Sequence, residues 1–386
     1  MKKATIIVLI IITFSCHSYE TSNFEYNPTS IRDQEMFLSN LADDVSYINL
    51  DNTVRIGYIT DIKIIKNAIF IQEKDIGVIR YDKKGKNPIR IGKIGRGPGE
   101  YQICKSFAIN EFNGMVYILS SGKNILVYNQ NGVFIRNIPL TGFETHFDGI
   151  EFLENNLVIS EDIKFGKAKY NWIIIDTSGK IIREKKNPIS SFKSKLGMHG
   201  GITKCKNGIL YWNIYNDTIY SIQPNLKYRV LFLFEKGNHR IPTSEYDPIN
   251  FMKYMRPYQI IDTKNYFILF YFYFTPKLDL IDKHSKEIFS TDIEIRFDQG
   301  GMDINGGILN DFDSGLSFHP ISYFYDNYEY LIGWINSYEL RDFMNATGIK
   351  GLSSPKYPEK KKELEKLAAS LKETDNPVLV LVRLKE

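Results

Sequence analysis

The chain contains little cysteine. Among its 386 residues the cysteines are Cys16, Cys104 and Cys205. Exported domains that depend on disulfides contain many more, so we expect disulfide bonds to play no part in stabilising this fold. Cys104 and Cys205 lie about a hundred residues apart, and we expect them to be two separate thiols.

Concentrated charge is also missing. The formal net charge is +4, from 49 basic and 45 acidic residues distributed along the chain. A basic tract with interleaved aromatic residues does not occur, which argues against nucleic acid as a partner. The sequence has no Gly-x-Ser-x-Gly nucleophile motif, no His-Glu-x-x-His zinc motif and no cysteine pair spaced for metal. We therefore predict neither a metal nor a cofactor.

Long apolar runs are absent except at the start. Lys2 and Lys3 precede an apolar run from Ala4 to Thr13, which is typical of a secretory signal peptide and too short for a stable transmembrane helix. The sequence Thr13-Phe14-Ser15-Cys16 follows, and a cysteine directly after a small residue indicates lipoprotein processing that acylates Cys16. An ordinary signal peptide that happens to contain a cysteine is the alternative.

These features predict a signal peptide at 1–15 and a tether at 16–41. The protein is then exported and anchored by lipid to the cell envelope, at the outer membrane. The sequence leaves open whether it faces the periplasm or the cell exterior.

Aromatic residues, by contrast, are abundant: 25 Tyr and 25 Phe favour strands over helices. Short apolar strands are followed by similar turns, and successive turns are 47 residues apart, beginning at Asp82, Asn129, Asp176 and Gln223. A fifth turn, at Asp282, follows after 59 residues. Asp or Asn opens a tight turn by accepting hydrogen bonds from its own backbone, and glycine tolerates the positive φ that closes it. Three equal intervals indicate a repeated supersecondary unit.

Each interval contains four short strands joined by hairpins. We predict them at 106–109, 115–119, 125–128 and 133–138, and again at 149–152, 157–160, 172–175 and 181–183. Four strands in 40 to 50 residues is the pattern of a propeller blade. The prediction is an all-β fold, a six-bladed β-propeller over residues 42–386, with five or seven blades as alternatives.

The last unit is interrupted by helix. Strands are expected at 316–325 and 330–335, followed by a helical insertion at about 337–375 and a final strand at 378–384. The clearest part of the insertion begins at Pro358 and carries one apolar face, formed by Leu364, Leu367, Ala368 and Leu371. A strand around 45–50 is available as the missing outer strand of this blade. That pairing closes the ring and removes exposed sheet edges.

One segment resembles a known family. Residues 95–101 read Gly-Arg-Gly-Pro-Gly-Glu-Tyr, which is similar to the junction motif of six-bladed, NHL-like propeller lipoproteins of gut-type Gram-negative bacteria. The segments Ala42–Leu50 and Asn376–Val380 also resemble that family. The resemblance implies the propeller fold and little chemistry, because members of this family are mostly of unknown function.

The same glycines have a structural interpretation. Four glycines and a proline between Gly92 and Gly99 suit a compact crossing from the outer strand of one blade to the inner strand of the next. A phosphate-binding loop would need a following helix and a Gly-Lys-Ser/Thr sequence, and neither is present.

Candidate binding residues come from the loops that enter each innermost strand, because in a propeller these loops converge on one mouth of the central channel. They are Asp61, Arg96, Glu100, Tyr101, His146, Asp148, His199, Arg256, Tyr258, Asp311 and Asp313. His146 and His199 are 53 residues apart, near the repeat length, and with the acids they could form a metal or proton-transfer site. The alternatives are a binding mouth without chemistry and ordinary solvated loop ends.

Three other features have a structural interpretation. His319 is expected to be packed in a strand, and His239 and His284 to be exposed in turns. The aromatic run from Tyr266 to Phe274 could stack on sugar rings, but a strand buried on both faces has the same composition, and we favour the strand.

The leading functional prediction is a membrane-anchored propeller that binds a glycan, a peptide or a partner protein at the channel mouth. The alternative is an extracytoplasmic hydrolase or lyase that acts on sugar or peptide through His146, His199 and neighbouring acids.

Overall fold

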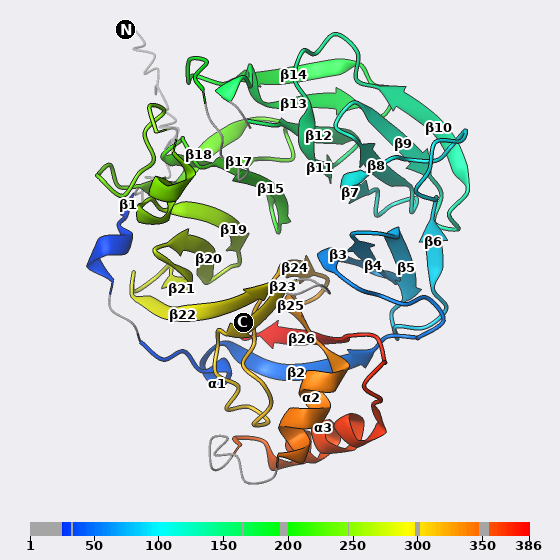
Figure 1. Ribbon diagram of the computed structural model, residues 1–386, viewed down its shortest axis with the longest axis vertical. Helices are drawn as coiled ribbons and strands as arrows, with labels where there is room; N and C mark the ends of the chain where they lie inside the picture. Colours follow the sequence, from blue (N-terminus) through cyan, green and yellow to red (C-terminus); the bar gives the residue numbers. More distant parts are fainter. Residues whose placement is uncertain are drawn as a thin grey trace, which may run out of the picture.

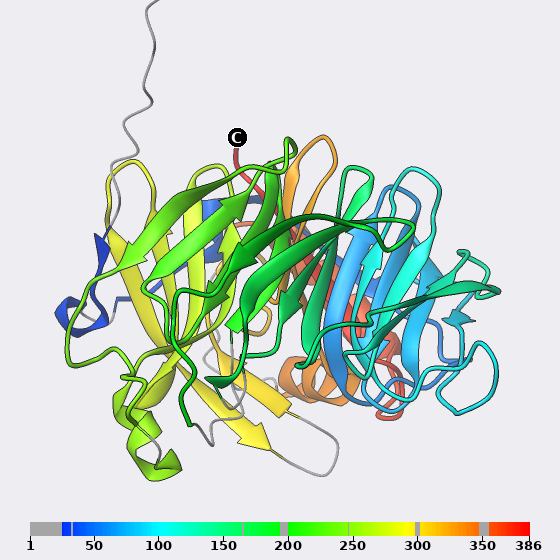
Figure 2. The same cartoon turned by 90° about the horizontal axis from the view of Figure 1, so that it is seen from above.

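The computed structural model describes residues 25–31, 34–163, 166–193, 200–245, 247–297, 302–346 and 355–386. In this part of the chain the backbone forms six sheets arranged around a common centre (Figure 1). Seen edge-on, they make a flattened disc (Figure 2). The protein is an all-β propeller with a short helical insertion in its last sheet, as the sequence predicts. We number the sheets as blades 1 to 6 in chain order of their innermost strands.

Blades 1 to 3 have four antiparallel strands each, which run outward in sequence order. Blade 1 consists of β3 (Ile59–Ile65), β4 (Ala68–Glu73), β5 (Gly77–Asp82) and β6 (Ile89–Ile91). Blade 2 consists of β7 (Cys104–Ile109), β8 (Val116–Ser120), β9 (Asn124–Tyr128) and β10 (Phe134–Pro139). Blade 3 consists of β11 (Phe147–Leu153), β12 (Asn156–Glu161), β13 (Tyr170–Asp176) and β14 (Ile181–Lys186). The strands of blades 2 and 3 match the predicted ones to within about three residues.

Blades 4 and 5 each have a fifth strand. Blade 4 consists of β15 (Gly200–Cys205), β16 (Gly208–Asn213), β17 (Thr218–Ile222) and β18 (Tyr228–Phe234), with β1 (Glu25–Tyr26) parallel to β18 at its outer edge. Blade 5 consists of β19 (Arg256–Asp262), β20 (Tyr266–Tyr273), β21 (Thr275–Asp282), β22 (Ile288–Phe297) and β23 (Met302–Gly306). A 3-10 helix, η3 (Pro248–Lys253), lies in the loop between the two blades.

Blade 6 joins the two ends of the chain. It consists of β24 (Ser322–Tyr325), β25 (Glu329–Ile335), β26 (Val378–Leu384) and β2 (Ala42–Asn49). The outermost strand, β2, pairs antiparallel with β26 along its whole length. The predicted closure by the N-terminal strand is therefore confirmed, and β26 has a partner strand on both of its edges.

Short helices accompany this closing blade. A 3-10 helix, η1 (Pro28–Ser30), and α1 (Leu38–Leu41) precede β2, while α2 (Ser337–Asn345) and α3 (Pro358–Ser370) lie between β25 and β26. Figure 1 shows α2 and α3 outside the sheet, against blade 6. Leu364, Ala368 and Leu371 are buried on the predicted apolar face of α3. Among the described helices, none is long and apolar enough to cross a membrane.

The hairpins between the third and fourth strands share one turn chemistry. The Oδ1 atoms of Asp82, Asn129 and Asp176 each accept hydrogen bonds from the backbone two and four residues later. A glycine with positive φ closes each of these turns, at Gly85, Gly132 and Gly179. In blade 4 the closing position is taken by Leu226, whose φ is +62°. The 47-residue interval is thus a repeat of whole blades.

Apolar side chains fill the spaces between neighbouring blades. Between blades 1 and 2, for example, Phe70, Phe107 and Ile118 belong to one cluster and are completely buried. The aromatic run of β20 is buried from Phe267 to Tyr271, as the strand interpretation requires. The second strands of blades 1 to 5 are therefore largely buried on both faces.

Several smaller predictions are also decided. Cys104 and Cys205 are free thiols, as expected, and the glycine-rich segment joins β6 to β7 as a blade-to-blade crossing. His284 is exposed, but His239 is buried at 5% exposure, so the prediction of an exposed turn residue was wrong there. The cause is the long loop after blade 4, which folds inward so that Met255 N donates to the carbonyl of His239. The strand predicted at 316–325 begins only at Ser322, because Pro320 lacks the N–H that a ladder needs.

Candidate functional site

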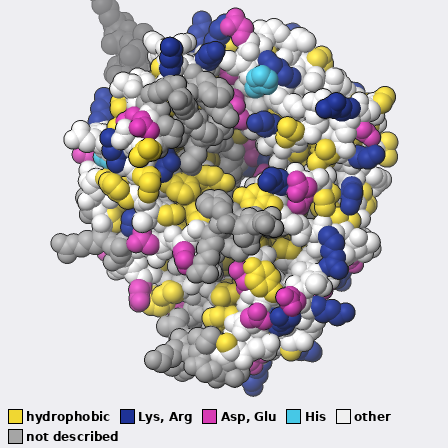
Figure 3. All heavy atoms as spheres, viewed as in Figure 1, with side chains coloured by type: hydrophobic (Ala, Val, Ile, Leu, Met, Phe, Trp, Pro, Cys, Tyr) yellow, Lys and Arg dark blue, Asp and Glu magenta, His cyan; other side chains and the backbone are white. Residues whose placement is uncertain are grey.

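A cavity of about 500 Å³ occupies the centre of the ring. Its walls come from the innermost strands of all six blades, β3, β7, β11, β15, β19 and β24. Figure 3 shows a hollow at the centre of one face, with hydrophobic and charged side chains gathered around it. A concave site of this size at the axis of a propeller is large enough for a small molecule or one segment of a longer ligand.

Four of the six innermost strands carry a β-bulge near their beginning. The register of each shifts by one residue against the next strand of the same blade, in blades 1, 2, 3 and 5. The residues left unpaired are Thr60, Lys105, Asp148 and Tyr258, and all four line the cavity. Because a bulge redirects the side chain of the extra residue, the same irregularity brings four side chains to one space.

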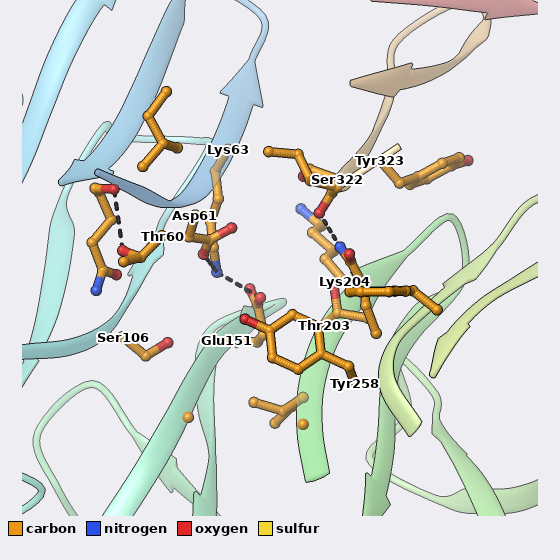
Figure 4. Close-up of a pocket in the computed structure, with 18 of the residues that line it drawn as sticks. Thr60, Asp61, Lys63, Ser106, Glu151, Thr203, Lys204, Tyr258, Ser322 and Tyr323 are labelled. Atoms are coloured by element: carbon orange, nitrogen blue, oxygen red, sulfur yellow. Dashed lines mark hydrogen bonds and ion pairs between the residues drawn. The ribbon is translucent and has the colours of Figure 1, made fainter. Parts of the chain in front are cut away.

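A charged cluster lies on the wall formed by blades 1 and 3. Lys63 Nζ is 2.5 Å from Glu151 Oε1 and 3.7 Å from Asp61 Oδ2. It also lies 5.1 Å from the centre of the Phe107 ring, a cation–π contact. Figure 4 shows Lys63 reaching from β3 toward Glu151 on β11. The ion pair therefore links two blades that are not neighbours in the ring.

The three groups of this cluster affect one another's protonation. Burial raises the pKa of Glu151, and the charge of Lys63 offsets only part of that rise. Burial also raises the pKa of Asp61. For Lys63, burial alone would lower the pKa, but Glu151 and Asp61 outweigh it and hold the pKa above its ordinary value. Lys63 thus remains an ammonium at neutral pH, and Asp61, with 32% of its side chain exposed against 7% for Glu151, is the carboxylate more open to a ligand.

The wall formed by blades 5 and 6 is aromatic. Tyr258 is 46% exposed in the cavity, and its ring stands edge-on to those of Phe270 and Phe272 at 5.3 and 6.1 Å. Burial raises the pKa of Tyr258, so its hydroxyl stays neutral. His319 packs edge-on to Phe270 at 4.9 Å, and burial lowers its pKa to about 4, which leaves a neutral imidazole.

Other polar side chains in the cavity have partners. Ser160 Oγ donates to Asp148 Oδ1 at 2.8 Å, and the amide of Gln259 donates to the carbonyl of Ile321. Lys204, at the C-terminal end of β15, forms an ion pair with Glu111. The cavity is therefore organised by its own hydrogen bonds before any ligand enters, which lowers the entropic cost of binding.

The structure brings three of the predicted site residues together. Asp61, Asp148 and Tyr258 line the cavity. His199 lies outside the described residues, and His146 is exposed beside β11 without lining the cavity. Whether any of these residues binds a ligand stays a prediction.

The remaining described candidates lie elsewhere. Glu100 accepts from Gly97 N, and Tyr101 is buried with its hydroxyl donating to the Ile91 carbonyl, so both belong to the glycine-rich crossing. Arg96 is exposed on the same crossing. Arg256 packs over the ring of Phe272, while Asp311 and Asp313 accept hydrogen bonds from Ser39 and Tyr47 on the chain that leads into blade 6.

Sequence reasoning missed Lys63, Glu151, Thr60 and Lys105. The candidates were sought in the loops before each innermost strand, whereas the cavity extends along the strands themselves. Charged residues inside otherwise apolar strands, such as Lys63 and Glu151, are the signal that could have found them. Among the described residues, no group of three or more His, Cys, Asp or Glu side chains is placed to hold a metal ion.

A family model described as "Domain of unknown function (DUF4934)" matches residues 24–383. The chain belongs to the DUF4934 family. No curated protein matches it.

Among solved structures, this DUF4934 protein is similar to a Bacteroides fragilis protein described as exported, with 19% identity, coverage of 94% of this chain and 99% of that chain, and a TM-score of 0.68. A DUF4221 family member from Bacteroides vulgatus has 13% identity, coverage of 89% and 97%, and a TM-score of 0.47. Virginiamycin B lyase from Staphylococcus aureus has 14% identity, coverage of 74% and 94%, and a TM-score of 0.43. At these identities, the first similarity supports the fold alone.

Proposed function

We propose that this DUF4934 protein is an exported, lipid-anchored binding propeller whose ligand enters the central cavity. The observation that carries the proposal is the set of four bulges, which direct Thr60, Lys105, Asp148 and Tyr258 to one space. Bulges interrupt ladder hydrogen bonds, and they occur frequently beside functional sites. Packing of the blades does not require them, because blades 4 and 6 have innermost strands without such a shift.

Binding fits the charged cluster better than hydrolysis does. A glycosidase holds two carboxylates on either side of the bond it cleaves. Here the ammonium of Lys63 contacts both Asp61 and Glu151 and occupies the space between them. The alternative, a hydrolase or lyase that uses His146 and His199, gains no support from the cavity, since His146 does not line it.

Export and anchoring rest on the predicted signal peptide and on Cys16. The similarity to a protein described as exported agrees with export. Metabolic labelling with an alkyne fatty acid tests the anchor: the wild-type protein should be labelled and sediment with membranes, and Cys16→Ser should lose both properties.

The binding proposal is tested by closing the cavity. Ser322 lines it from β24, so Ser322→Trp should fill part of the volume, while Lys84→Trp adds the same ring on an exposed turn of blade 1. Isothermal titration calorimetry is run with neutral oligosaccharides, acidic oligosaccharides and short peptides of either charge. We expect at least one class to bind the wild-type and Lys84→Trp proteins and to lose at least about tenfold in affinity for Ser322→Trp. Binding by no class, or equal binding by all three proteins, contradicts the proposal, provided circular dichroism shows that Ser322→Trp is folded.

A further inference from the structure

Charges of both signs are interspersed in the cavity. Seven charged side chains line it: Asp61, Glu111, Asp148, Glu151, Lys63, Lys105 and Lys204. On the wall of blades 1 and 3, an anionic ligand is repelled by Asp61, Asp148 and Glu151. A cationic ligand there is repelled by the ammonium of Lys63, which lies beside Asp61 and Glu151. A like charge in a partly desolvated site is repelled strongly, because the effective dielectric constant there is low. The cavity thus disfavours a ligand with net charge of either sign.

Hydroxyl groups, in contrast, suit every polar group on that wall. A hydroxyl donates to a carboxylate and accepts from an ammonium, so one type of ligand group can satisfy both Asp61 and Lys63. Asp61 is the carboxylate that can accept a hydrogen bond from a ligand, because its Oδ2 lies as far as 3.7 Å from Lys63 Nζ. Thr60, placed beside it by the bulge in β3, adds a hydroxyl whose bond to the Gln72 carbonyl is 3.1 Å.

Tyr258 supplies a ring on the other side of the cavity. Figure 4 shows it entering from β19, opposite the strand that carries Asp61 and Lys63. Its edge-on contacts with Phe270 and Phe272 fix the ring while leaving 46% of the residue exposed. A half-exposed and fixed aromatic ring is a platform for the apolar C–H face of a ligand ring.

We propose that the central cavity binds a neutral sugar ring of a glycan, stacked on Tyr258 with its hydroxyl groups hydrogen-bonded to Asp61 and Lys63. This inference rests on the proposed function and names its ligand class. A sugar ring is the ligand that presents an apolar face to one wall and uncharged hydroxyl groups to the opposite wall.

A side cavity of about 170 Å³ leads away from the central one. The two share Ile304, His319, Ile321 and Trp334, so they are contiguous. Both ring nitrogens of His319 are buried at this junction, without a hydrogen-bond partner in the part of the chain that the structure describes. The side cavity therefore offers room for the next unit of a chain, beside a histidine that carries no charge.

The experiment compares ligand classes on the purified protein. The probes are neutral hexasaccharides (cellohexaose, laminarihexaose, xylohexaose and mannohexaose), trigalacturonic acid, chitosan hexamer, and tripeptides of lysine and of glutamate. We expect a neutral hexasaccharide to bind, and its affinity to change by less than about twofold between 0.05 and 0.5 M NaCl, because screening acts on charged ligands.

Substitutions at Tyr258 test the stacking. Tyr258→Ala should weaken binding about tenfold or more, whereas Tyr258→Phe keeps the ring and should stay within about twofold of wild type. Tyr228→Ala is the matched control, because Tyr228, at the start of β18 in blade 4, is 47% exposed and does not line the cavity. A neutral sugar that binds Tyr258→Ala as tightly as wild type contradicts the inference.

The outcomes separate the two proposals. If trigalacturonic acid, chitosan hexamer or a tripeptide is the probe that binds, and Ser322→Trp abolishes that binding, the cavity is a binding site and the neutral-sugar inference is wrong. If no probe binds, both fail.

Discussion

Blades 1 to 3, which repeat at 47 residues, and blade 6, which closes the ring, are built differently. In blades 1 to 3 every strand comes from one continuous stretch of chain, and an Asp or Asn turn with a closing glycine sets the outer hairpin. Blade 6 takes its outer strand from β2, more than 270 residues before β24, and blade 4 gains β1 from the same N-terminal segment. Local hydrogen bonds determine the first kind of blade, and contacts distant in sequence determine the second.

Asn376 offers the largest test of this difference. It is buried immediately before β26, and its side chain accepts from Ile56 N and donates to the carbonyls of Asp51 and Val54, all at 2.8 to 2.9 Å. Asn376→Ala removes these three hydrogen bonds and leaves partly buried backbone groups without their partner, so we expect a loss of about 3–4 kcal/mol in the free energy of unfolding. Asn129→Ala removes two exposed turn hydrogen bonds and should cost about 1 kcal/mol.

Urea denaturation followed by tryptophan fluorescence measures both losses. Equal losses for the two variants would mean that the closing blade is no more dependent on long-range contacts than a repeated one.

Asp279 and Asp176 should respond to pH in opposite directions. Asp279 accepts a hydrogen bond from the hydroxyl of Tyr26 and so links the N-terminal segment to blade 5. Burial raises the pKa of Asp279 to about 6, although hydrogen bonds from Ser290, Tyr26 and Tyr271 act to lower it. Its folded pKa lies above the unfolded value, so its contribution to stability is complete below about pH 4 and is lost as the pH rises through 6. For Asp176, hydrogen bonds from Ser178 and the turn backbone lower the pKa, so its contribution is lost as the pH falls below the usual range of aspartate.

Replacing each with asparagine isolates these effects in unfolding free energies measured from pH 4 to 7. Asp279 should lower the free energy of unfolding by about 2–3 kcal/mol between pH 4 and 6, and Asp279→Asn should abolish this decrease. Asp176→Asn should leave that fall in place. If the stability difference between wild type and Asp279→Asn stays constant from pH 4 to 7, the raised pKa of Asp279 is wrong.

The smallest effect concerns the closing position of the turns. Gly179 has a φ of +99°, and a Cβ there would lie 2.6 Å from Ile138 Cγ2, so Gly179→Ala should cost about 1–2 kcal/mol. Leu226 occupies the same position in blade 4 with a φ of +62° and packs partly against the core. Leu226→Gly relieves the backbone strain but loses this packing, so its free energy of unfolding should stay within about 1 kcal/mol of wild type. If Leu226→Gly destabilises the protein more than Gly179→Ala does, packing rather than turn conformation controls this position.

Much of the fold was accessible from the sequence, and less of the site was. The turns at Asp82, Asn129 and Asp176 act through bonds within four residues, so their spacing revealed the blades. The bulges at Thr60, Lys105, Asp148 and Tyr258 have no such signature, because a bulge is defined by the pairing of two strands. Only Asp148 and Tyr258 of these four were named in advance, because the sequence predicted both to lie in loops that enter innermost strands, whereas they lie within β11 and β19. Lys63 and Glu151 were missed because their pairing joins blades 1 and 3 across the channel.

The sequence by itself determined the all-β class, the repeating blade, the helical insertion and the closure by β2, because period-two patterning and turn chemistry act over short stretches of chain. The tertiary structure alone decided which polar residues share the cavity. Asp61, Lys63 and Glu151 meet there, whereas Glu100 and Asp313, equally polar in sequence, accept hydrogen bonds elsewhere. The position of a side chain on the channel wall depends on the register of each strand against its neighbour and on how the ring closes. Both are set by packing between segments far apart in the chain.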